Sequence, residues 1–146
     1  MSSSNITPTV GVLINQIDGR YQSIIYRSML SYAQKNSIRL IFFVGRALNS
    51  PYPGEEQYNS VYELAKSNKL QGLIVVSGSL GNYVGTSGLS LYLKEFSGIP
   101  KISISFKLDE IPSILIDNYS GMKELLNHLI VEHGYRRFAY IGGQKE

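Results

Sequence analysis

One stretch near the end of the chain, residues 114–143, constrains the fold more than any other because its signals come in a fixed order. Its opening apolar run ends at Asp117 and Asn118, whose side-chain oxygens can accept hydrogen bonds from the free N–H groups at a helix start. The apolar residues that follow have the spacing of one helix face: Met122, Leu125, Leu126, Leu129 and Ile130. Gly134 can adopt the left-handed conformation that ends a helix. With the apolar run 138–141, the stretch predicts a strand, a helix, a stop and a second strand.

The rest of the chain alternates short apolar runs with segments of helical spacing. The apolar runs predict strands over residues 9–14, 38–44, 72–76 and 101–105. The segments between them predict helices around residues 21–32, 58–65 and 89–96. This alternation predicts an α/β fold, a doubly wound, Rossmann-like parallel sheet with helices on both faces.

The residues that follow the predicted strands form the candidate binding site. In a doubly wound sheet, ligands bind at the carboxyl ends of the strands, where the winding direction reverses. These positions are mostly hydroxyls, amides and carboxylates, which suit a small polar ligand. The candidate ligand-binding residues are Asn15, Gln16, Asp18, Arg46, Ser77, Ser79, Asn82, Ser105, Phe106, Asp117 and Asn118. For each polar residue among these candidates, the alternative role is to cap a helix or to form a turn. Tyr52 and Tyr83, in nearby loops, are candidates for covering a ligand ring.

Several enzyme classes are excluded by missing residues. No G-x-G-x-x-G follows the first strand, as a dinucleotide site requires, and the glycines of residues 77–85 lack the lysine of a phosphate-binding P-loop. The chain has no cysteine, which excludes thiolate catalysis and cysteine metal sites. Its two histidines, His128 and His133, are five residues apart, whereas a helical metal pair needs four. We therefore expect neither a cofactor nor a metal.

An α/β hydrolase is the remaining enzyme alternative. Residues 77–81 nearly spell the G-x-S-x-G elbow, and Ser79, Asp117 and a histidine follow in the required chain order. However, Ser77 replaces the first elbow glycine, and both histidines fall on the helix after Asp117 instead of on a loop beside the nucleophile. We therefore keep the hydrolase as a remote alternative and expect no catalysis.

Charge and hydropathy limit the classes of partner that we expect for this chain. The 146-residue chain has a net charge of +3, and its basic residues are scattered, with Arg136 and Arg137 as the densest spot. The first residues contain no secretion signal, and no apolar run reaches transmembrane length. We therefore expect a cytoplasmic protein that contacts neither a membrane nor a nucleic acid directly.

The opening stretch also resembles a known sequence pattern. Asp117 and Asn118, Gly121, the pair His128 and Leu129, Gly134 with Tyr135, and residues 138–142 keep the order and spacing of this pattern. It is the pattern of the lac-repressor (LacI) and ribose-binding-protein superfamily, the periplasmic-binding-protein type 1 group. The resemblance extends over residues 9–143.

The resemblance implies a ligand-binding lobe. In that superfamily, two similar α/β lobes close around a small ligand, often a sugar or another metabolite. The resemblance implies a tail over residues 1–8, an N-terminal α/β lobe over 9–136, and the first strand of a truncated second lobe over 137–146. The implied function is sensing of a small molecule by lobe closure, in a LacI-type transcriptional regulator or signalling protein. A solute-binding protein for transport is the alternative.

Finer features of the resemblance point to sensor modules. Residues 78–82 and 116–122 are most similar to LacI-type modules that precede histidine kinase or diguanylate cyclase outputs. No helix-turn-helix module precedes the first strand here, and Ser105 stands where many repressors hold a ligand-binding aspartate. The hinge is expected near residues 134–137. Because an incomplete lobe exposes apolar surface, we expect a homo-oligomer.

Overall fold

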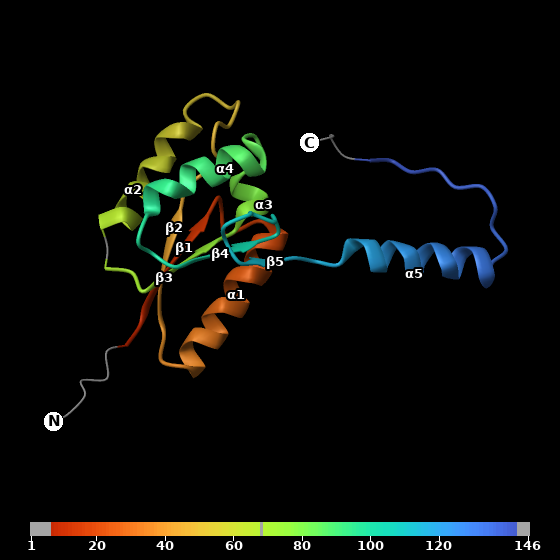
Figure 1. Cartoon of the computed structure of the whole chain (residues 1–146), viewed down its shortest axis with the longest axis horizontal. Helices are drawn as coiled ribbons and strands as arrows, with labels where there is room; N and C mark the ends of the chain where they lie inside the picture. Colours follow the sequence, from red (N-terminus) through yellow and green to blue (C-terminus); the bar gives the residue numbers. More distant parts are fainter. Residues whose placement is uncertain (1–6, 68, 143–146) are drawn as a thin grey trace. The chain divides into compact units, whose positions relative to one another are not determined.

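The structure is a computed structural model that describes residues 7–67 and 69–142 (Figure 1). The chain divides into two compact units, Met1–Ile114 and Leu115–Glu146. Of the predicted tail over residues 1–8, residues 1–6 lie outside the described part. None of the helices in the described part is long and apolar enough to cross a bilayer.

The first unit is built on a five-stranded sheet with the order β2-β1-β3-β4-β5. The strands are β1 (Thr9–Ile14), β2 (Arg39–Val44), β3 (Gly72–Val75), β4 (Lys101–Ile104) and β5 (Ser113–Ile114). All neighbours pair in parallel, and Val12 of β1 lies between Phe42 of β2 and Ile74 of β3. The winding direction reverses between β1 and β3, because the chain moves outward from β1 to β2 and then returns to the other side of β1. The predicted α/β fold class is confirmed.

Helices cover both faces of this sheet. They are α1 (Arg20–Lys35), α2 (Ser60–Ser67), α3 (Ser77–Leu80) and α4 (Gly85–Leu93), with two 3-10 helices, η1 (Glu55–Asn59) and η2 (Lys94–Phe96). Figure 1 shows α1 on one side of the sheet and α2 and α4 on the other. The short helix α3 was not predicted. It forms at the exit of β3, where we expected a loop.

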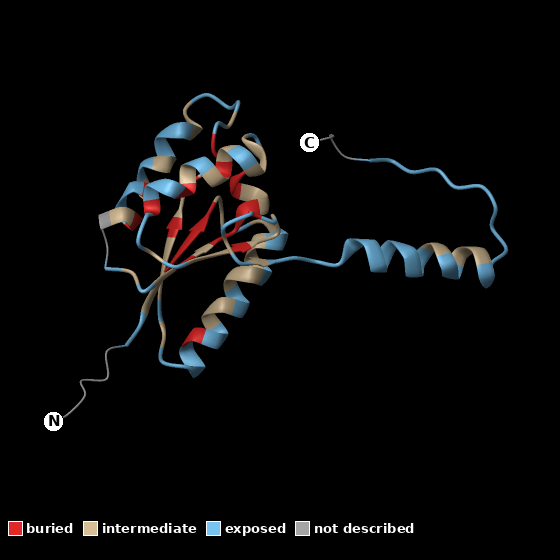
Figure 2. Ribbon diagram, in the orientation of Figure 1, coloured by how far each residue is buried: buried red, intermediate tan, exposed pale blue. Residues whose placement is uncertain are grey.

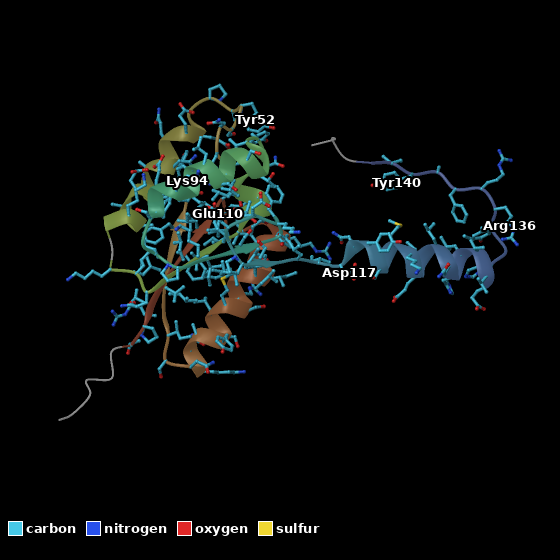
Figure 3. The ribbon with its side chains drawn as sticks, viewed as in Figure 1. Tyr52, Lys94, Glu110, Asp117, Arg136 and Tyr140 are labelled. Carbon is cyan, nitrogen blue, oxygen red and sulfur yellow. The ribbon has the colours of Figure 1, made fainter. Side chains whose placement is uncertain are left out.

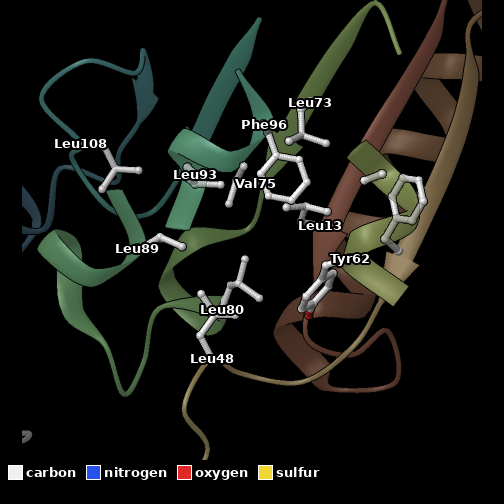
Figure 4. Packing of buried hydrophobic residues seen from close by; sticks show 12 residues of the cluster. Leu13, Leu48, Tyr62, Leu73, Val75, Leu80, Leu89, Leu93, Phe96 and Leu108 are labelled. Carbon is white, nitrogen blue, oxygen red and sulfur yellow. The ribbon is translucent and has the colours of Figure 1, made fainter. Parts of the chain in front are cut away.

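The two faces of β1 belong to two separate hydrophobic clusters. Because side chains alternate along a strand, Leu13 points to one face while Val12 and Ile14 point to the other. Leu13 packs in the larger cluster, beneath α2 and α4, together with residues such as Tyr62 and Leu89 (Figure 4). Val12 and Ile14 form the smaller cluster, beneath α1. All three β1 residues are fully buried, as the predicted two-faced strand requires.

Helix α1 turns only some of its apolar residues toward the sheet. Ile25 and Met29 pack against the smaller cluster, and Ala33, one turn further, is buried. Ile24 and Tyr32, which have the same apolar character, are exposed. The spacing predicted the helix, but an apolar stripe this wide allows more than one inner face.

The second unit contains α5 (Asn118–Val131). The helix begins at Asp117, whose carboxylate accepts a hydrogen bond of 2.9 Å from the backbone N–H of Ser120. This hydrogen bond lowers the pKa of Asp117. The predicted capping role of Asp117 is therefore present, and so is the left-handed glycine, since Gly134 has a φ of 67°.

The strand predicted over residues 138–141 is not formed in this structure. Residues 134–142 have no regular secondary structure, and Ile141 is 98% exposed. A strand needs a neighbour to satisfy its N–H and C=O groups, and none of the strands in the described residues pairs with this segment. The domain boundaries at residues 8, 136 and 137 stay predictions.

Candidate functional site

A cavity of about 670 Å³ lies in the first unit, at the carboxyl ends of β1 to β4. This is the edge of the sheet at which the winding rule places a ligand. The residues that line it are Asn15, Gln16, Tyr21, Gln22, Arg46, Ala47, Tyr52, Glu55, Gly78, Ser79, Asn82, Tyr83 and Ser105. Figure 3 labels Tyr52 on the loop between β2 and η1.

Six of the eleven candidate binding residues line this cavity. They are Asn15, Gln16, Arg46, Ser79, Asn82 and Ser105. Both loop tyrosines predicted to cover a ligand ring, Tyr52 and Tyr83, line it as well. The structure thus brings together residues from four separate strand exits.

The Arg46 side chain is held in place by four contacts. Its guanidinium Nη1 donates hydrogen bonds to the carbonyl oxygens of Gly45 (2.9 Å) and Asn15 (3.4 Å). Its Nε lies 3.6 Å from a carboxylate oxygen of Glu55. Its Cζ lies 4.7 Å from the centre of the Tyr58 ring, within cation–π range. A side chain with this many contacts is oriented before any ligand arrives.

Glu55 balances the charge of Arg46 within the cavity. Besides its ion pair with Arg46, Glu55 accepts a hydrogen bond of 2.5 Å from the hydroxyl of Ser50. Among the described residues, Arg46 and Glu55 are the only charged ones that line the cavity, one cation and one anion. The lining therefore has no net formal charge, and its other polar groups are amides, hydroxyls and phenols.

Tyr62 supports the site from the core. It is fully buried, and its hydroxyl lies 3.2 Å from the carbonyl oxygen of Ile14 and 3.0 Å from that of Arg46. Burial raises the pKa of Tyr62 well above its usual range. Gly45 makes this approach possible, because a Cβ there would lie 2.5 Å from the Tyr62 ring. Tyr62 therefore ties the exits of β1 and β2 together.

Ser105 joins the exit of β4 to the start of α1. Its φ of 89° is in the left-handed region, which is rare for a residue other than glycine. Its hydroxyl lies 2.8 Å from the hydroxyl of Tyr21. Gly78 of α3 permits the close approach of α3 to the turn after β4, since a Cβ at this position would lie 2.7 Å from the Cβ of Ser105. Backbone strain of this kind is concentrated at functional sites.

Five of the predicted binding residues lie elsewhere. Ser77 is buried. Its hydroxyl is hydrogen-bonded to the hydroxyl of Ser103 (2.7 Å), to the carbonyl oxygen of Ile104 (2.5 Å) and to the N–H of Phe106 (2.9 Å). Phe106 packs against the larger hydrophobic cluster. Both residues therefore shape the turn after β4 from inside the core instead of lining the cavity.

The other three have exposed positions. Asp18 lies on the loop before α1, outside the lining of the cavity. Asp117 and Asn118 belong to the second unit, where Asp117 caps α5. Their polar side chains follow a strand, as the rule requires, but capping is the role that the structure shows for Asp117.

The sequence analysis missed Tyr21, Gln22 and Glu55. Tyr21 and Gln22 lie in the first turn of α1, and the Gln22 amide donates to the side chain of Asn15 at 3.4 Å. The available signal was position, because the first turn after a strand exit lies at the same edge of the sheet as the exit itself.

The hydrolase triad is not assembled in the first unit. Ser79 lies in the short helix α3, and its hydroxyl donates a hydrogen bond of 3.2 Å to the carbonyl oxygen of Val76. Both histidines of the chain belong to the second unit, so the first unit holds no histidine base. Among the residues that the structure describes, no three His, Cys, Asp or Glu side chains form a group able to hold a metal ion.

Comparison with known proteins rests on structure alone. No protein-family model matches the sequence, and no curated protein matches it. Several solved structures resemble the chain, among them the following three. The first is a periplasmic binding protein/LacI transcriptional regulator from Alkaliphilus metalliredigens QYMF, complexed with D-xylulofuranose. It has a TM-score of 0.54 and 20% sequence identity, and the match covers 84% of this chain and 41% of that one.

Two further structures carry a sugar in their names. An ABC sugar transporter subunit from Rhodobacter sphaeroides 2.4.1 has a TM-score of 0.59 and 14% identity, over 87% of this chain and 42% of that one. A periplasmic binding ribose operon repressor protein from Lactobacillus acidophilus has a TM-score of 0.51 and 16% identity, over 80% and 39%. The chain therefore spans about two-fifths of the length of these proteins. As the sequence resemblance predicted, the chain has an α/β lobe fold like that of periplasmic binding proteins and LacI-type regulators.

Proposed function

We propose that the chain is one lobe of a small-molecule-binding domain and that it binds a neutral, hydroxyl-rich ligand such as a sugar. The observation that carries this proposal is the lining of the cavity, where Arg46 is balanced by Glu55 and the other polar groups are uncharged. Amides, hydroxyls and phenols can each pair with a ligand hydroxyl as donor or acceptor. Tyr52 and Tyr83 add flat apolar surface that can stack on a sugar ring.

The charge balance argues against an anionic ligand. A carboxylate or phosphate would be attracted by Arg46 but repelled by Glu55, whose Oε1 lies 3.6 Å from the Arg46 Nε. Binding such an anion would also remove solvent from the Glu55 carboxylate, and the anion has no hydrogen-bond donor to replace that solvent. This desolvation costs free energy. A neutral ligand keeps the ion pair intact and can use the free edges of both side chains.

In a two-lobed protein, such a ligand acts by favouring the closed state. A ligand shifts the equilibrium only by the difference between its affinities for the open and closed states. Contacts from one lobe alone therefore give weak binding, and we expect a dissociation constant of about 1 mM or weaker for this chain. We further propose a cytoplasmic sensor that assembles as a homo-oligomer and controls transcription or signalling.

Transport is the second candidate. The likeness to an ABC sugar transporter subunit supports a solute-binding protein, which would use the same cavity. The two functions differ in the surface that responds to closure. If the ligand changes the oligomeric state in sedimentation velocity, this supports the sensor, while a ligand-bound monomer supports the solute-binding protein.

NMR titration tests the neutral-ligand proposal. D-Ribose and D-ribose 5-phosphate differ in charge, and because the ester on O5 also restricts the phosphate to furanose rings, methyl β-D-ribofuranoside is included as a neutral furanose control. We expect ribose to shift signals of the residues that line the cavity and ribose 5-phosphate to bind more weakly. If the phosphate binds more tightly, the ligand is not neutral. If neither sugar shifts these signals at 100 mM, a ligand concentration at which even weak binding is seen, the sugar-binding proposal itself fails.

A substitution at Glu55 sharpens this test. Glu55→Gln removes the negative charge of the cavity and leaves Arg46 unbalanced, so we expect ribose 5-phosphate to bind at least about fivefold more tightly, or ~1 kcal/mol. Glu56→Gln is the matched control, because Glu56 is the adjacent exposed residue and does not line the cavity. Equal effects of the two substitutions would show that net charge alone, and not the Arg46–Glu55 pair, governs the preference.

A further inference from the structure

The two histidines of the chain lie side by side in the second unit. The Nε2 atoms of His128 and His133 are 3.1 Å apart, and the two rings meet edge to face with centroids separated by 4.8 Å. Both residues belong to the second unit, and both are exposed. The chain contains no other histidine and no cysteine. All of its imidazole nitrogens therefore belong to this one pair.

The end of α5 explains why a spacing of five residues brings these rings together. In a continuous helix, five residues correspond to a rotation of about 140° away from the starting face. However, α5 ends at Val131, and Gly134 then adopts the left-handed conformation, with a φ of 67°. The N–H of Tyr135 donates to the carbonyl of Leu129 at 3.1 Å, so the chain folds back over the last turn. This turn places His133 against His128, which the spacing rule did not allow for.

A third ring holds the pair. The Tyr135 ring is stacked on the His133 ring, with centroids 5.6 Å apart and planes within 16° of parallel. The orientation of His133 is therefore restrained from one side by Tyr135 and from another by His128. Two rings oriented by a backbone turn and a stacking contact lose less freedom when they bind a third body.

The distance between the two nitrogens suits a metal ion. Two imidazole nitrogens bound to a tetrahedral Zn²⁺ at ~2.0–2.1 Å are roughly 3.3–3.4 Å apart, and at square-planar Cu²⁺ or Ni²⁺ they are about 2.9 Å apart. The observed 3.1 Å lies between these values. In the absence of metal, the same distance is that of a hydrogen bond in which one Nε2–H donates to the other Nε2.

We propose that His128 and His133 form a chelating site for a divalent transition cation such as Zn²⁺. Both Nε2 lone pairs bind the ion. The ring that donated its Nε2–H changes tautomer, giving up this proton and taking one from solvent at Nδ1, so both rings bind as neutral Nδ1–H imidazoles and no net proton is released. Water completes the coordination, because no third His, Cys, Asp or Glu joins the pair in the part of the chain that the structure describes. The bound ion ties the last turn of α5, through His128, to His133 in the turn that follows the helix. This proposal does not depend on the sugar-binding function.

The test is a titration of the tag-free 146-residue chain with ZnCl₂ at neutral pH, followed through the imidazole nitrogens by ¹H–¹⁵N NMR. Only two rings contribute signals, so both can be followed without ambiguity. We expect one Zn²⁺ per chain, with the Nε2 signals of both histidines shifting together. His128→Gln and His133→Gln should each weaken binding at least about tenfold, because each leaves a single ligand.

A glycine substitution tests the role of the turn. Gly134→Ala keeps both histidines but disfavours the left-handed turn that brings them together, so we expect Zn²⁺ to bind several-fold more weakly. Gly98→Ala is the matched control, because Gly98 also has a positive φ (78°) and open space around it but belongs to the first unit. This control should leave Zn²⁺ binding unchanged.

Three results would overturn the proposal. The first is the absence of any imidazole shift at 1 mM ZnCl₂, which would leave only a hydrogen bond between the rings. The second is that either single glutamine variant binds as tightly as the parent chain. The third is that Zn²⁺ binds only as a bridge between two molecules, seen in sedimentation as a dimer with one ion per pair of chains.

Discussion

Helices α1 and α5 have similar amphipathic sequences but different surroundings. On α1, Ile25 and Met29 pack against Val12 and Ile14 of the sheet. On α5, by contrast, the apolar residues are largely exposed, as Figure 2 shows, and Leu125 is 51% exposed. The apolar spacing therefore specifies a helix in both cases, but it buries the stripe only where the same unit supplies a surface to cover it.

The ends of the two helices show the reverse contrast. The N-cap of α1 is Gly19, which makes no side-chain hydrogen bond to the helix, and its last turn is followed by Ser37 at a φ of 54°. Helix α5 has the Asp117 carboxylate at its start and Gly134 beyond its end. Local signals thus specify α5, whereas tertiary packing stabilises α1. The comparison leads to four predictions, in order of decreasing effect.

Hydrogen exchange should separate the helices most strongly. An isolated helix of fewer than about 15 residues is marginally stable in water, and α5 has 14 residues. We expect amide protection factors below about 10 in α5 and above ~10³ in α1, whose opening requires breaking its packing on the sheet. Hydrogen–deuterium exchange followed by NMR measures both. Equal protection would mean that the apolar face of α5 is covered in solution.

Truncation of one apolar side chain near each helix should have unequal effects. Ile14→Ala, beneath α1, should lower the free energy of unfolding by roughly 2–5 kcal/mol because it leaves a cavity in a fully buried cluster. Leu125→Ala on α5 should change it by less than ~0.5 kcal/mol. Urea unfolding followed by tyrosine fluorescence gives both values. A loss above 1 kcal/mol for the Leu125 variant would contradict the contrast.

The residues after the two helices should respond to glycine substitutions with opposite signs. Ser37→Gly removes the strain of a non-glycine residue at positive φ and should stabilise the first unit by about 1 kcal/mol. Gly134→Ala introduces that strain and should reduce the helix content of α5. Thermal unfolding and circular dichroism measure these effects. Ser31→Gly, in the exposed middle of α1, is the control and should destabilise by roughly 0.5 kcal/mol.

The start of α5 should show the smallest effect, one that depends on pH. The N–H of Ser120 donates to the Asp117 carboxylate and lowers its pKa, so the folded helix favours the ionised form. The contribution is complete above the pKa that Asp117 has in the unfolded chain, and it is lost as the pH falls through the lower pKa of the folded helix. We therefore expect the ellipticity of α5 to decrease in acid.

Two substitutions at Asp117 isolate this effect. Asp117→Asn keeps a side-chain acceptor but does not titrate, so the acid-dependent loss of helix should disappear. Asp117→Ala should reduce helix content at every pH. If the asparagine variant loses helix in acid as the parent chain does, another group is responsible.

The cavity at the carboxyl ends of the strands shows which site residues the sequence could predict and which it could not. The rule that ligands bind at strand exits located Asn15, Arg46 and Ser79 at the cavity, because a parallel sheet brings all carboxyl ends to one edge. It failed for Ser77, which turns inward in the one-turn helix α3. It also missed Glu55, which reaches the cavity from η1 instead of from a strand exit. Strand order predicts an edge, but it does not predict the direction in which a side chain points.

The order of residues along the chain is enough to predict the alternation of strands and helices, the α/β class, and the capped start and glycine end of α5. These features depend on residues within one or two helical turns of each other, so a linear pattern contains them. The polar groups that share the cavity are known only from the folded chain, as with Tyr21 and Ser105, whose hydroxyls meet across 84 residues. The folded chain likewise shows which apolar stripe is buried and which is exposed. Both outcomes depend on the close approach of distant segments, as where Gly78 meets Ser105, and no local pattern encodes such an approach.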